Sequence, residues 1–551
     1  MKFSFFVIGL ICWFDTFAQF ETDITYRQLD SIIYGTNPDT EAPGMGAIVI
    51  KDDSIVYFTS TGYANTKRKL PIGLYTQYNI GSITKMFTTT AILLLEEEGN
   101  LKRTDEIHQY IPELPAYPQP ITINHLLGHT SGIRDHFEVA SFLFNYNKKL
   151  VSFEGMLNYQ NEFPELNTNT GESFAYSNTG YMLLALIIEK VSNQSYESYL
   201  AENIFKPLGM ENSFATREKQ KYLADGTTNY PQKTNGKFKK PFEYYDALGA
   251  TGVYATLYDM YLWDKNFYNN KLGKQSQSLI DTLQHSFALN SGESVNYGCG
   301  IIEKKYRGKI AYEHSGGWGY YLTQYRRFPD EHISVIAWNN SDNYSPFTTV
   351  DKICNAIFKF DTTKTMSDML PGFNQKTLEG IYITNNNLIR EVKVKGDSLI
   401  LRLPLQQSAR FHNLTYAGSF RDSIITYVDT LNNPVVFIKS EGRVVGFKWQ
   451  GGEYFVANRY YSKIDENNII PTKKLTGKYE NGQQNKKVKI SYKKYRHQLY
   501  LRNFIFYKMK MEHVCGNVYY LPEYQFYVRA ESDKIILGDD WIFNLTYTKN
   551  K

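Results

Sequence analysis

The spacing of apolar and polar positions divides the chain into two regions. In the first, up to about residue 360, helical and strand patterns are mixed. Apolar residues recur at helical spacing over 87–98 and 180–194, which predicts two helices that each have an apolar face. A third helix, which closes this region, is predicted over 345–360.

Short apolar runs bounded by turns predict an antiparallel sheet in the same region. Two runs flank a turn at Asp52 and Asp53, and three later runs follow one another through short links, as antiparallel neighbours do. The predicted strands are Met45–Ile50, Ile55–Ser60, Ala311–His314, Tyr321–Phe328 and Ile333–Trp338. Because strands stand at both ends with helices between them, residues 20–360 are predicted to form an α+β domain whose ends share one sheet.

The second region carries strand patterns alone. A linker is predicted over 361–375, followed by two all-β modules over 376–465 and 473–550, barrel-like or sandwich-like. Alternating segments within the modules, such as 391–394 and 487–491, fit strands that have one buried face.

An internal repeat is the reason for predicting two modules. An L-x-G-x-Y motif occurs at 378–382 and again at 475–479, and an L-x-L-R motif occurs at 399–402 and again at 499–502. The two motifs keep a similar spacing in both copies. The alternative is that the copies are diverged halves of one sheet, because the matches are short.

Length and composition agree with a globular protein of several domains. A chain of 551 residues is too long for one ordinary core. Hydrophobic residues make up 42% and charged residues 21%, as in folded proteins. The net charge is +5, and lysines and arginines are scattered, whereas a nucleic-acid-binding protein concentrates them in a patch. We therefore expect no nucleic-acid partner.

The first residues have the pattern of a secretory signal peptide. Residues 1–18 contain one basic residue and an apolar run, and Thr16 and Ala18 are the small residues before a predicted cleavage after Ala18. Cys12 raises the alternative of a lipoprotein signal, which the bulky Ile11 before it disfavours. No later run reaches about 18 apolar residues, so we expect no transmembrane segment in the mature chain, and a secreted or periplasmic location.

Cysteines and histidines give no sign of a metal or redox site. The mature chain keeps Cys299, Cys354 and Cys515, with no CxxC pair. A disulfide between two of them is one alternative, and small buried residues are the other. His125 and His129 are four residues apart, but no H-E-x-x-H motif is present. We predict no metal and no cofactor.

The first candidate for chemistry is an S-x-x-K motif formed by Ser82 and Lys85, at the start of a predicted helix and directly after Gly81. Residues three apart in a helix are neighbours, so the lysine amine can approach the serine hydroxyl. A serine is a weak nucleophile until a base takes its proton, and a lysine can act as base only if its pKa is lowered. The helix start also favours an oxyanion. The alternative is a serine cap followed by a solvated lysine.

The same spacing occurs once more, at Ser491 and Lys494. This second pair lies in a predicted strand, where residues three apart point to opposite faces. We interpret it as a chance match.

The second candidate is a Y-x-N motif, Tyr176 and Asn178, just before the helix over 180–194. Residues two apart in an extended turn point the same way. A phenol can relay a proton between nucleophile and leaving group, and an amide can hold a substrate oxygen or Lys85. The motif alone is weak evidence, because it recurs by chance at Tyr63, Tyr159, Tyr268 and Tyr479.

The third candidate is the run His314, Ser315, Gly316 and Gly317 at the end of a predicted strand. His314 and Gly316 share one face of that strand. A glycine lets a substrate backbone approach closely, and a strand N–H can complete an oxyanion hole with the N–H of Ser82. The alternative is a histidine at a strand end followed by a glycine turn.

Together and in this order, the motifs resemble those of the penicillin-recognising serine hydrolases, the family of class C β-lactamases, D-alanyl-D-alanine carboxypeptidases, D-aminopeptidases and esterases. That family carries S-x-x-K, then Y-x-N, then K-T-G or H-x-G. The resemblance covers about residues 40–345. Four further segments are similar to the family's L-L-x-H-T-S-G, F-x-P-L-G-M, G-G-x-x-S-T-x-x-D and Y-G-x-G segments, namely 126–132, 205–210, 249–259 and 297–300.

The resemblance implies a β-lactamase/transpeptidase-like fold, in which an antiparallel sheet with flanking helices and a helical lobe enclose the site. It implies that Ser82 forms the acyl-enzyme, that Lys85 is its proton partner and that Tyr176 is a general base. Whether the lysine or the tyrosine is the base stays open. Asn178 would position the substrate, and the N–H groups of Ser82 and Gly317 would form the oxyanion hole.

His314 departs from the family's dedicated β-lactamases, which have a lysine there. A neutral imidazole holds a substrate carboxylate more weakly than an ammonium group does. We therefore expect slow β-lactam hydrolysis and favour D-amino-acid peptides, amides or esters, peptidoglycan-derived molecules among them. Substrate binding is predicted to involve His314 and the following Ser315, Gly316 and Gly317.

The predicted function is that of a serine hydrolase of peptidase, amidase or esterase type in the cell envelope. The alternative is a catalytically idle, penicillin-binding-like receptor or scaffold that uses the pocket and the β modules for binding. The intact set of four motif side chains favours the enzyme. The β modules resemble the accessory barrels of some D-aminopeptidases, which implies that they shape the site; a role in stability or partner binding is the alternative.

Overall fold

The structure is a computed structural model that describes residues 26–358 and the strands between residues 380 and 549. Within 26–358 the description omits residues 38, 138–151, 218–226, 231–232, 235–236, 239–245, 307–308 and 342–344. The predicted signal peptide (1–18) and linker (361–375) lie outside the described residues and stay predictions. Among the described residues, no helix has the length and apolar character needed to cross a membrane.

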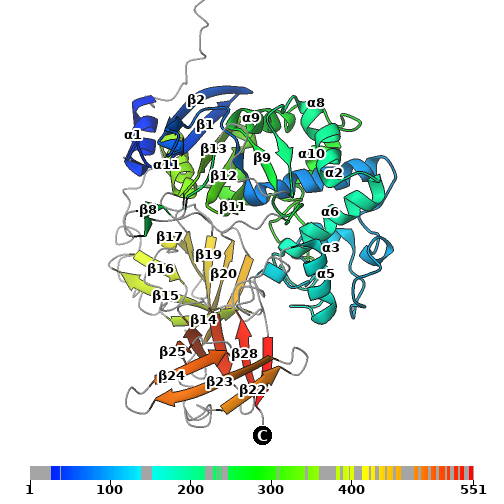
Figure 1. The fold of residues 1–551 in the computed structure, drawn as a ribbon. Helices are drawn as coiled ribbons and strands as arrows, with labels where there is room; N and C mark the ends of the chain where they lie inside the picture. The colour runs from blue at the N-terminus through cyan, green and yellow to red at the C-terminus, as the bar shows by residue number, and fades with distance from the viewer. Residues whose placement is uncertain are drawn as a thin grey trace, which may run out of the picture.

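A six-stranded antiparallel sheet forms the centre of the first region, in the order β10-β11-β12-β13-β1-β2 (Figure 1). Its strands are β1 (Met45–Lys51), β2 (Ser54–Thr61), β10 (Ile302–Tyr306), β11 (Lys309–Trp318), β12 (Tyr321–Phe328) and β13 (Ile333–Asn339). Strand β1 pairs with β2 on one side and with β13 on the other. The prediction that the two ends of an α+β domain share one antiparallel sheet is therefore confirmed.

Helices cover both faces of this sheet. They are α1 (Tyr26–Thr36), α2 (Thr84–Glu97), α3 (Ile123–Leu127), α5 (Phe153–Glu162), α6 (Asn178–Ser192), α7 (Tyr196–Leu200), α8 (Lys206–Leu208), α9 (Leu257–Asn266), α10 (Gln277–Gln284) and α11 (Pro346–Phe358). Short turns of other helix types are η1 (Gly81–Ile83), η2 (Ile107–Gln109), η3 (Ala201–Phe205) and η4 (Pro329–Glu331). Shorter strands are β3 (Tyr63–Asn65), β4 (Leu70–Pro71), β5 (Tyr78–Asn79), β6 (Phe214–Ala215), β7 (Lys233–Thr234), β8 (Lys237–Phe238) and β9 (Val253–Ala255).

Strand β1 is apolar at successive positions because both of its faces are buried. Ala47 and Val49 belong to a core shared with α1 and α11, whereas Ile48 and Ile50 belong to the larger core on the other face. Side chains alternate between the faces of a strand, so a strand covered on both sides needs an unbroken apolar run.

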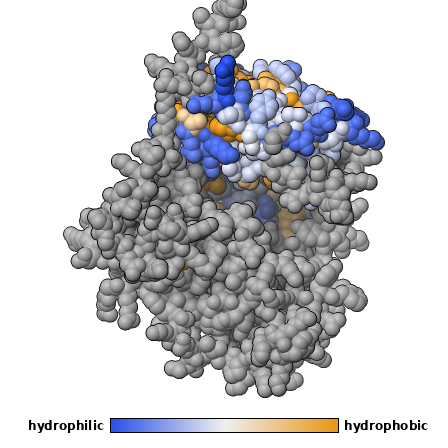
Figure 2. All heavy atoms as spheres, turned by 90° about the vertical axis from the view of Figure 1, so that its left-hand side faces the viewer, coloured by the Kyte–Doolittle hydropathy of each residue, from blue (hydrophilic) through white to orange (hydrophobic). Residues whose placement is uncertain are grey.

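On the face that Figure 2 shows, hydrophilic residues predominate in the coloured part of the surface.

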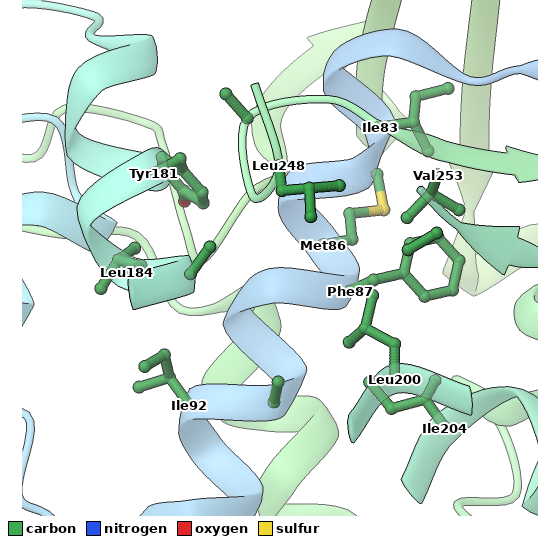
Figure 3. Close-up of a cluster of buried hydrophobic side chains, with 14 of the residues drawn as sticks. Ile83, Met86, Phe87, Ile92, Tyr181, Leu184, Leu200, Ile204, Leu248 and Val253 are labelled. Atoms are coloured by element: carbon green, nitrogen blue, oxygen red, sulfur yellow. The ribbon is translucent and has the colours of Figure 1, made fainter. Parts of the chain in front are cut away.

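Helix α2 runs through the middle of the larger core. Every residue from Thr84 to Leu95 is buried, and Figure 3 shows its side chains Met86 and Phe87 pointing toward neighbouring elements. Tyr181 and Leu184 of α6 are part of the same cluster. This packing fixes the position of the side chains at the start of α2.

Most predicted elements are present with small differences at their ends. Helix α6 begins two residues earlier than predicted because the hydroxyl of Ser177 accepts a hydrogen bond from the N–H of Gly180 and caps the helix. Strand β11 extends beyond its predicted end and includes Gly316 and Gly317, because both are paired with β12. The backbone pairing outweighs the low strand preference of glycine.

The strands of the second region pair in two closed rings (yellow, and orange to red, in Figure 1). The first ring contains β14 (Gly380–Thr384), β15 (Ile389–Lys395), β16 (Ser398–Arg402), β17 (His412–Phe420), β18 (Ile424–Val428), β19 (Pro434–Ser440), β20 (Arg443–Gln450) and β21 (Tyr454–Tyr460). The second contains β22 (Gly477–Asn481), β23 (Lys486–Lys493), β24 (Gln498–Asn503), β25 (Lys508–Cys515), β26 (Val518–Leu521), β27 (Phe526–Ala530), β28 (Lys534–Gly538) and β29 (Leu545–Lys549).

The repeated motifs occupy equivalent strands of the two rings. Strands β14 and β22 each begin at the glycine of L-x-G-x-Y, and β16 and β24 each contain L-x-L-R. The division of this region into two modules stays a prediction. The module boundaries, 376–465 and 473–550, stay predictions.

Candidate active site

Ser82 lies on the tight turn η1, directly before α2. Gly81 precedes it with φ +55°, a conformation that glycine adopts without strain, and its N–H donates to Oδ1 of Asn79 at 2.8 Å. Ile83 and Met86, which follow Ser82 in the chain, are buried in the hydrophobic core. The Ser82 side chain is thereby left half-buried at the end of a fixed helix.

The Lys85 amine is fully buried and contacts three oxygens. Its Nζ donates to Oγ of Ser82 at 3.1 Å, to Oδ1 of Asn178 at 2.8 Å and to the carbonyl oxygen of Ala250 at 3.0 Å. Burial lowers the pKa of Lys85 from 10.5 to about 7, because a charged amine loses its hydration there. A large fraction of the amine is then neutral near pH 7 and able to accept a proton.

Tyr176 adjoins the same pair. Its ring centroid lies 4.8 Å from Nζ of Lys85, and its hydroxyl is hydrogen-bonded to Ser82. Burial raises the pKa of Tyr176 above that of a free tyrosine, and the bond to Ser82 opposes this only in part. The phenol is therefore protonated at neutral pH in the resting site.

The turn that carries Tyr176 and Asn178 is held by side chains from the segment before α5. His129 stacks on Tyr176 with a centroid distance of 4.2 Å, and its Nδ1 accepts from the N–H of Ser177 at 3.0 Å. Asp135 accepts from the N–H of Asn178 at 2.5 Å. Both contacts fix the turn from outside the Y-x-N motif.

His314 lies near Tyr176, with a ring-centroid distance of 6.3 Å, and both of its ring nitrogens have hydrogen-bond partners. It is 3% exposed; its Nε2 is hydrogen-bonded to the hydroxyl of Tyr297 at 3.2 Å and its Nδ1 to the carbonyl oxygen of Ser315 at 2.6 Å. Burial and the nearby Lys85 lower its pKa to about 4. The imidazole is therefore neutral at pH 7, and in this arrangement its ring nitrogens already have partners within the chain.

The two glycines after Ser315 differ in their surroundings. Gly316 is buried, and a Cβ added there would lie 2.0 Å from the carbonyl oxygen of Ile80. Gly317 is exposed, and its N–H adjoins Gly81, where an added Cβ would lie 2.2 Å from the nitrogen of Gly317. The backbones of β11 and η1 thus pack directly on each other, which only glycine permits.

The structure therefore brings the predicted residues together from three distant parts of the chain. Ser82, Lys85, Tyr176 and Asn178 contact one another, and the backbone of Gly317 joins them. The sequence interpretation assigned no role to four further residues of this cluster, namely His129, Asp135, Ala250 and Tyr297. His129, Ala250 and Tyr297 lie in segments that carried the family resemblance. Membership of those segments was the sequence feature that could have pointed to these three residues.

Side chains considered for metal or redox chemistry have other surroundings. Nδ1 of His125 accepts from the N–H of Thr122 in a helix cap, and His129 binds the Y-x-N turn. Cys299 and Cys354 are buried free thiols. Within the part of the chain that the structure describes, no group of three or more His, Cys, Asp or Glu side chains is arranged to hold a metal ion.

If the N–H of Gly317 belongs to an oxyanion hole, as the sequence predicts, Gly316→Ala should lower the labelling rate of Ser82 by about 10²–10³-fold, the usual effect of losing such a donor. The added methyl would displace β11 from the backbone of Ile80 and move the N–H of Gly317 with it. The measurement is the labelling rate with a fluorophosphonate probe.

Two glycine variants serve as controls for this prediction. At Gly317 an added Cβ meets only Cδ2 of Leu322 at 3.4 Å, so Gly317→Ala should keep the melting temperature of the wild type. At Gly73 the atom nearest to an added Cβ is Oγ1 of Thr76 at 3.8 Å, so Gly73→Ala should keep both the melting temperature and the labelling rate of the wild type. Unchanged labelling of Gly316→Ala would show that β11 supplies no oxyanion donor.

The structure has an antiparallel sheet with helices on both faces, and a serine and a lysine one turn apart at the start of a buried helix. These features define the class of β-lactamase/transpeptidase-like proteins. Residues 24–353 match the family model described as Beta-lactamase, which is more than half of the chain. The chain belongs to the Beta-lactamase family, whose members are β-lactamases and penicillin-binding serine hydrolases.

Curated relatives are similar over part of their length. "Penicillin-binding protein 4*" of Bacillus subtilis is 30% identical over 302 residues, 52% of this chain and 66% of that protein. "Putative penicillin-binding protein PbpX" of B. subtilis is 30% identical over 46% of this chain and 61% of that protein. "Protein flp" of Staphylococcus aureus strain N315 is 31% identical over 44% of this chain and 45% of that protein. The chain thus spans less than two thirds of these relatives.

Solved structures show the same fold. The octameric penicillin-binding protein homologue from Pyrococcus abyssi is 26% identical, with a TM-score of 0.56 over 79% of this chain and all of that chain. A D-stereospecific amidohydrolase from Streptomyces sp. is 20% identical, with a TM-score of 0.50 over 61% of this chain and 99% of that chain. The second likeness shows the fold alone.

Proposed function

We propose that this chain is a serine hydrolase that acts through an acyl-enzyme on Ser82. The observation that supports the proposal most directly is the buried amine of Lys85, 3.1 Å from Oγ of Ser82 and with a pKa of about 7. A buried lysine in a structural role usually keeps its charge by pairing with a carboxylate, whereas the three oxygens that Lys85 contacts are all uncharged. An amine that is largely neutral at physiological pH can instead take the serine proton.

The proposed reaction has two stages. Oγ of Ser82 attacks the carbonyl carbon of the substrate while its proton passes to Lys85 or Tyr176. The tetrahedral intermediate collapses as the leaving amine or alcohol takes that proton, and an ester on Ser82 remains. Water, deprotonated by the same pair, then attacks the ester, releases the acid and returns the proton to Ser82.

Tyr176 is proposed as the proton carrier between Ser82 and the leaving group. Its hydroxyl is bonded to Ser82, and the amine of Lys85 lies over its ring face. Because the pKa of the phenol is raised by burial, Tyr176 becomes basic only while a neighbouring cation stabilises its charge. Lys85 is therefore the simpler acceptor in the first step, and Tyr176 the simpler donor in the second.

Oxyanion stabilisation is assigned to the N–H groups of Ser82 and Gly317. The close packing of η1 on β11 brings the two backbones together, and the start of α2 adds a favourable dipole. Asn178 would hold the substrate amide as well as Lys85.

For the substrate we propose D-amino-acid peptides, amides or esters of the cell envelope, with β-lactams cleaved slowly. The neutral His314, whose nitrogens are both bonded within the chain, offers no cation for a substrate carboxylate at that position. The penicillin-binding names of the curated relatives support an envelope location, and we propose that the protein is secreted or periplasmic after loss of its signal peptide. The two strand rings are proposed as accessory modules of the hydrolase.

The experiment that tests the proposal is covalent labelling. The mature protein is treated with a fluorophosphonate probe and, separately, with a fluorescent penicillin, and the adduct is located by mass spectrometry. We expect a phosphonyl adduct on the peptide that contains Ser82. Absence of any adduct would favour the idle receptor, which binds ligands without covalent chemistry.

A substrate panel then separates the reaction types. We expect D-amino-acid amides or short-chain esters to be cleaved faster than nitrocefin. Fastest turnover of nitrocefin would contradict the substrate argument from His314 but not the acyl-enzyme on Ser82.

A further inference from the structure

We propose that Asp135 is a positioning residue of this site, which fixes the Y-x-N turn through its hydrogen bonds and controls the charge of the Lys85 amine. The inference rests on the proposed function, because it concerns the same reaction on Ser82. Asp135 lies outside every motif of the sequence interpretation, three residues after Gly132.

The carboxylate of Asp135 is fully buried and uses both oxygens. Oδ1 accepts from the N–H of Phe137 at 2.9 Å, and Oδ2 accepts from the N–H of Asn178 at 2.5 Å. Asn178 is the first residue of α6, where the helix dipole favours a negative charge. The side chain of the same Asn178 accepts from Lys85, so one residue connects the carboxylate to the amine.

A carboxylate is an expensive way to hold a helix start. Burying a charge costs much more than burying a hydroxyl, and neutral residues cap helices well. The neighbouring Ser177 does so for this helix. A charge at Asp135 is therefore explained better by its electrostatic effect on the amine of Lys85, to which Asn178 connects it.

Asp135 opposes the effect of burial on that amine. Its negative charge raises the pKa of Lys85, whereas loss of hydration lowers it to about 7. Asp135 acts on Tyr176 in the same direction. Without the charge, both groups would lose their protons at lower pH.

Among the residues that the structure describes, the histidines and tyrosines next to the amine keep one charge state between pH 6 and 9. Burial holds the pKa of His129 well below its usual value and lowers that of His314 to about 4, so both are neutral. Burial raises the pKa of Tyr176 and of Tyr181, whose ring also adjoins the amine. Lys85 is thus the group of this cluster that titrates in that range.

The test is the pH dependence of fluorophosphonate labelling in Asp135→Asn. We expect the wild-type labelling rate to rise with pH through a midpoint near pH 7, the pKa of Lys85, because only the neutral amine can accept the proton of Ser82. In Asp135→Asn we expect this midpoint about one pH unit lower, the usual effect of removing an opposite charge nearby. A lower maximal rate should accompany the shift, because an amide places an NH₂ group against one of the two N–H donors.

Two further variants separate charge from structure. Asp135→Ser removes the charge with a shorter polar side chain that places no NH₂ group against the N–H donors, and it should show the same shift if Asp135→Asn fails to fold. Glu165→Gln removes a carboxylate that pairs with Arg134 beside the same segment, and its midpoint should stay at the wild-type value. A midpoint that does not move in either Asp135 variant would reduce Asp135 to a structural residue and overturn the inference.

A second readout does not depend on catalysis. Because the folded pKa of Lys85 is about 7 and the unfolded value 10.5, the contribution of Lys85 to stability is most favourable above pH 10.5 and becomes less favourable as the pH decreases toward 7. In Asp135→Asn the melting temperature should continue to fall below pH 7, and this difference should vanish in the Lys85→Met background. If wild-type Ser82 is never labelled, the proposed function fails, and these melting curves alone decide the role of Asp135.

Discussion

Replacing Ser82 by alanine is expected to abolish fluorophosphonate labelling and to lower hydrolysis of any cleaved substrate by about 10⁴-fold or more. The loss is this large because every later step passes through the ester on Ser82, so no other group of the site can substitute for it. The measurement is the rate of labelling together with turnover of the best substrate in the panel.

The fold should be unaffected by this change. Ser82 is half-buried on a turn whose position is set by the buried Ile83 and Met86, and none of these contacts depends on the hydroxyl. The melting temperature of Ser82→Ala should therefore stay close to that of the wild type. A loss of activity can then be assigned to chemistry.

The chain contains its own control. Ser491 and Lys494 have the same spacing as Ser82 and Lys85, but Ser491 lies in strand β23. Ser491→Ala should be labelled like the wild type. Equal labelling of Ser82→Ala and the wild type would contradict the proposal, because the probe would then be reacting with a residue other than Ser82.

The S-x-x-K pair was predictable because its contact is local. Three residues of helical or near-helical chain suffice to bring Lys85 to Ser82, whatever the rest of the fold does. The detail that differs is the type of turn: Ser82 lies on η1, and the α-helix begins at Thr84. The tighter turn could not be foreseen from spacing alone.

The surroundings of His314 were not predictable in the same way. The strand pattern correctly placed His314 and Gly316 on one face, and both are buried. What the pattern could not give is the hydroxyl of Tyr297, which reaches Nε2 of His314 from another part of the chain. A histidine that looks like a substrate ligand in sequence can thus be fully hydrogen-bonded in the fold.

Asp135 and His129 illustrate the same limit. Each acts on Tyr176 or Asn178 across more than forty residues of chain, and a carboxylate or imidazole gains such a role only when the fold brings it there. The sheet, in contrast, was predictable from its apolar runs, because burial on both faces leaves a pattern in β1 and β13 themselves.

Replacing Lys85 by methionine is the second change with a large expected effect. Methionine has a similar length and suits a fully buried position, but it cannot accept a proton. We expect the labelling rate of Ser82 to fall by about 10²–10⁴-fold, the usual contribution of a general base. The matched control is Lys190→Met on the exposed side of α6, which should leave the rate unchanged.

Comparison with Lys85→Arg decides how the lysine acts. A guanidinium keeps its charge at neutral pH, so it can stabilise a Tyr176 phenolate but cannot take a proton from Ser82. If Lys85 is the base, Lys85→Arg should be as slow as Lys85→Met, and neither rate should retain the midpoint near pH 7. Substantial labelling of Lys85→Arg would instead make Tyr176 the base and Lys85 its supporting cation. Labelling of Lys85→Met within about tenfold of the wild type would contradict both roles, because the loss would then fall below the range for a general base.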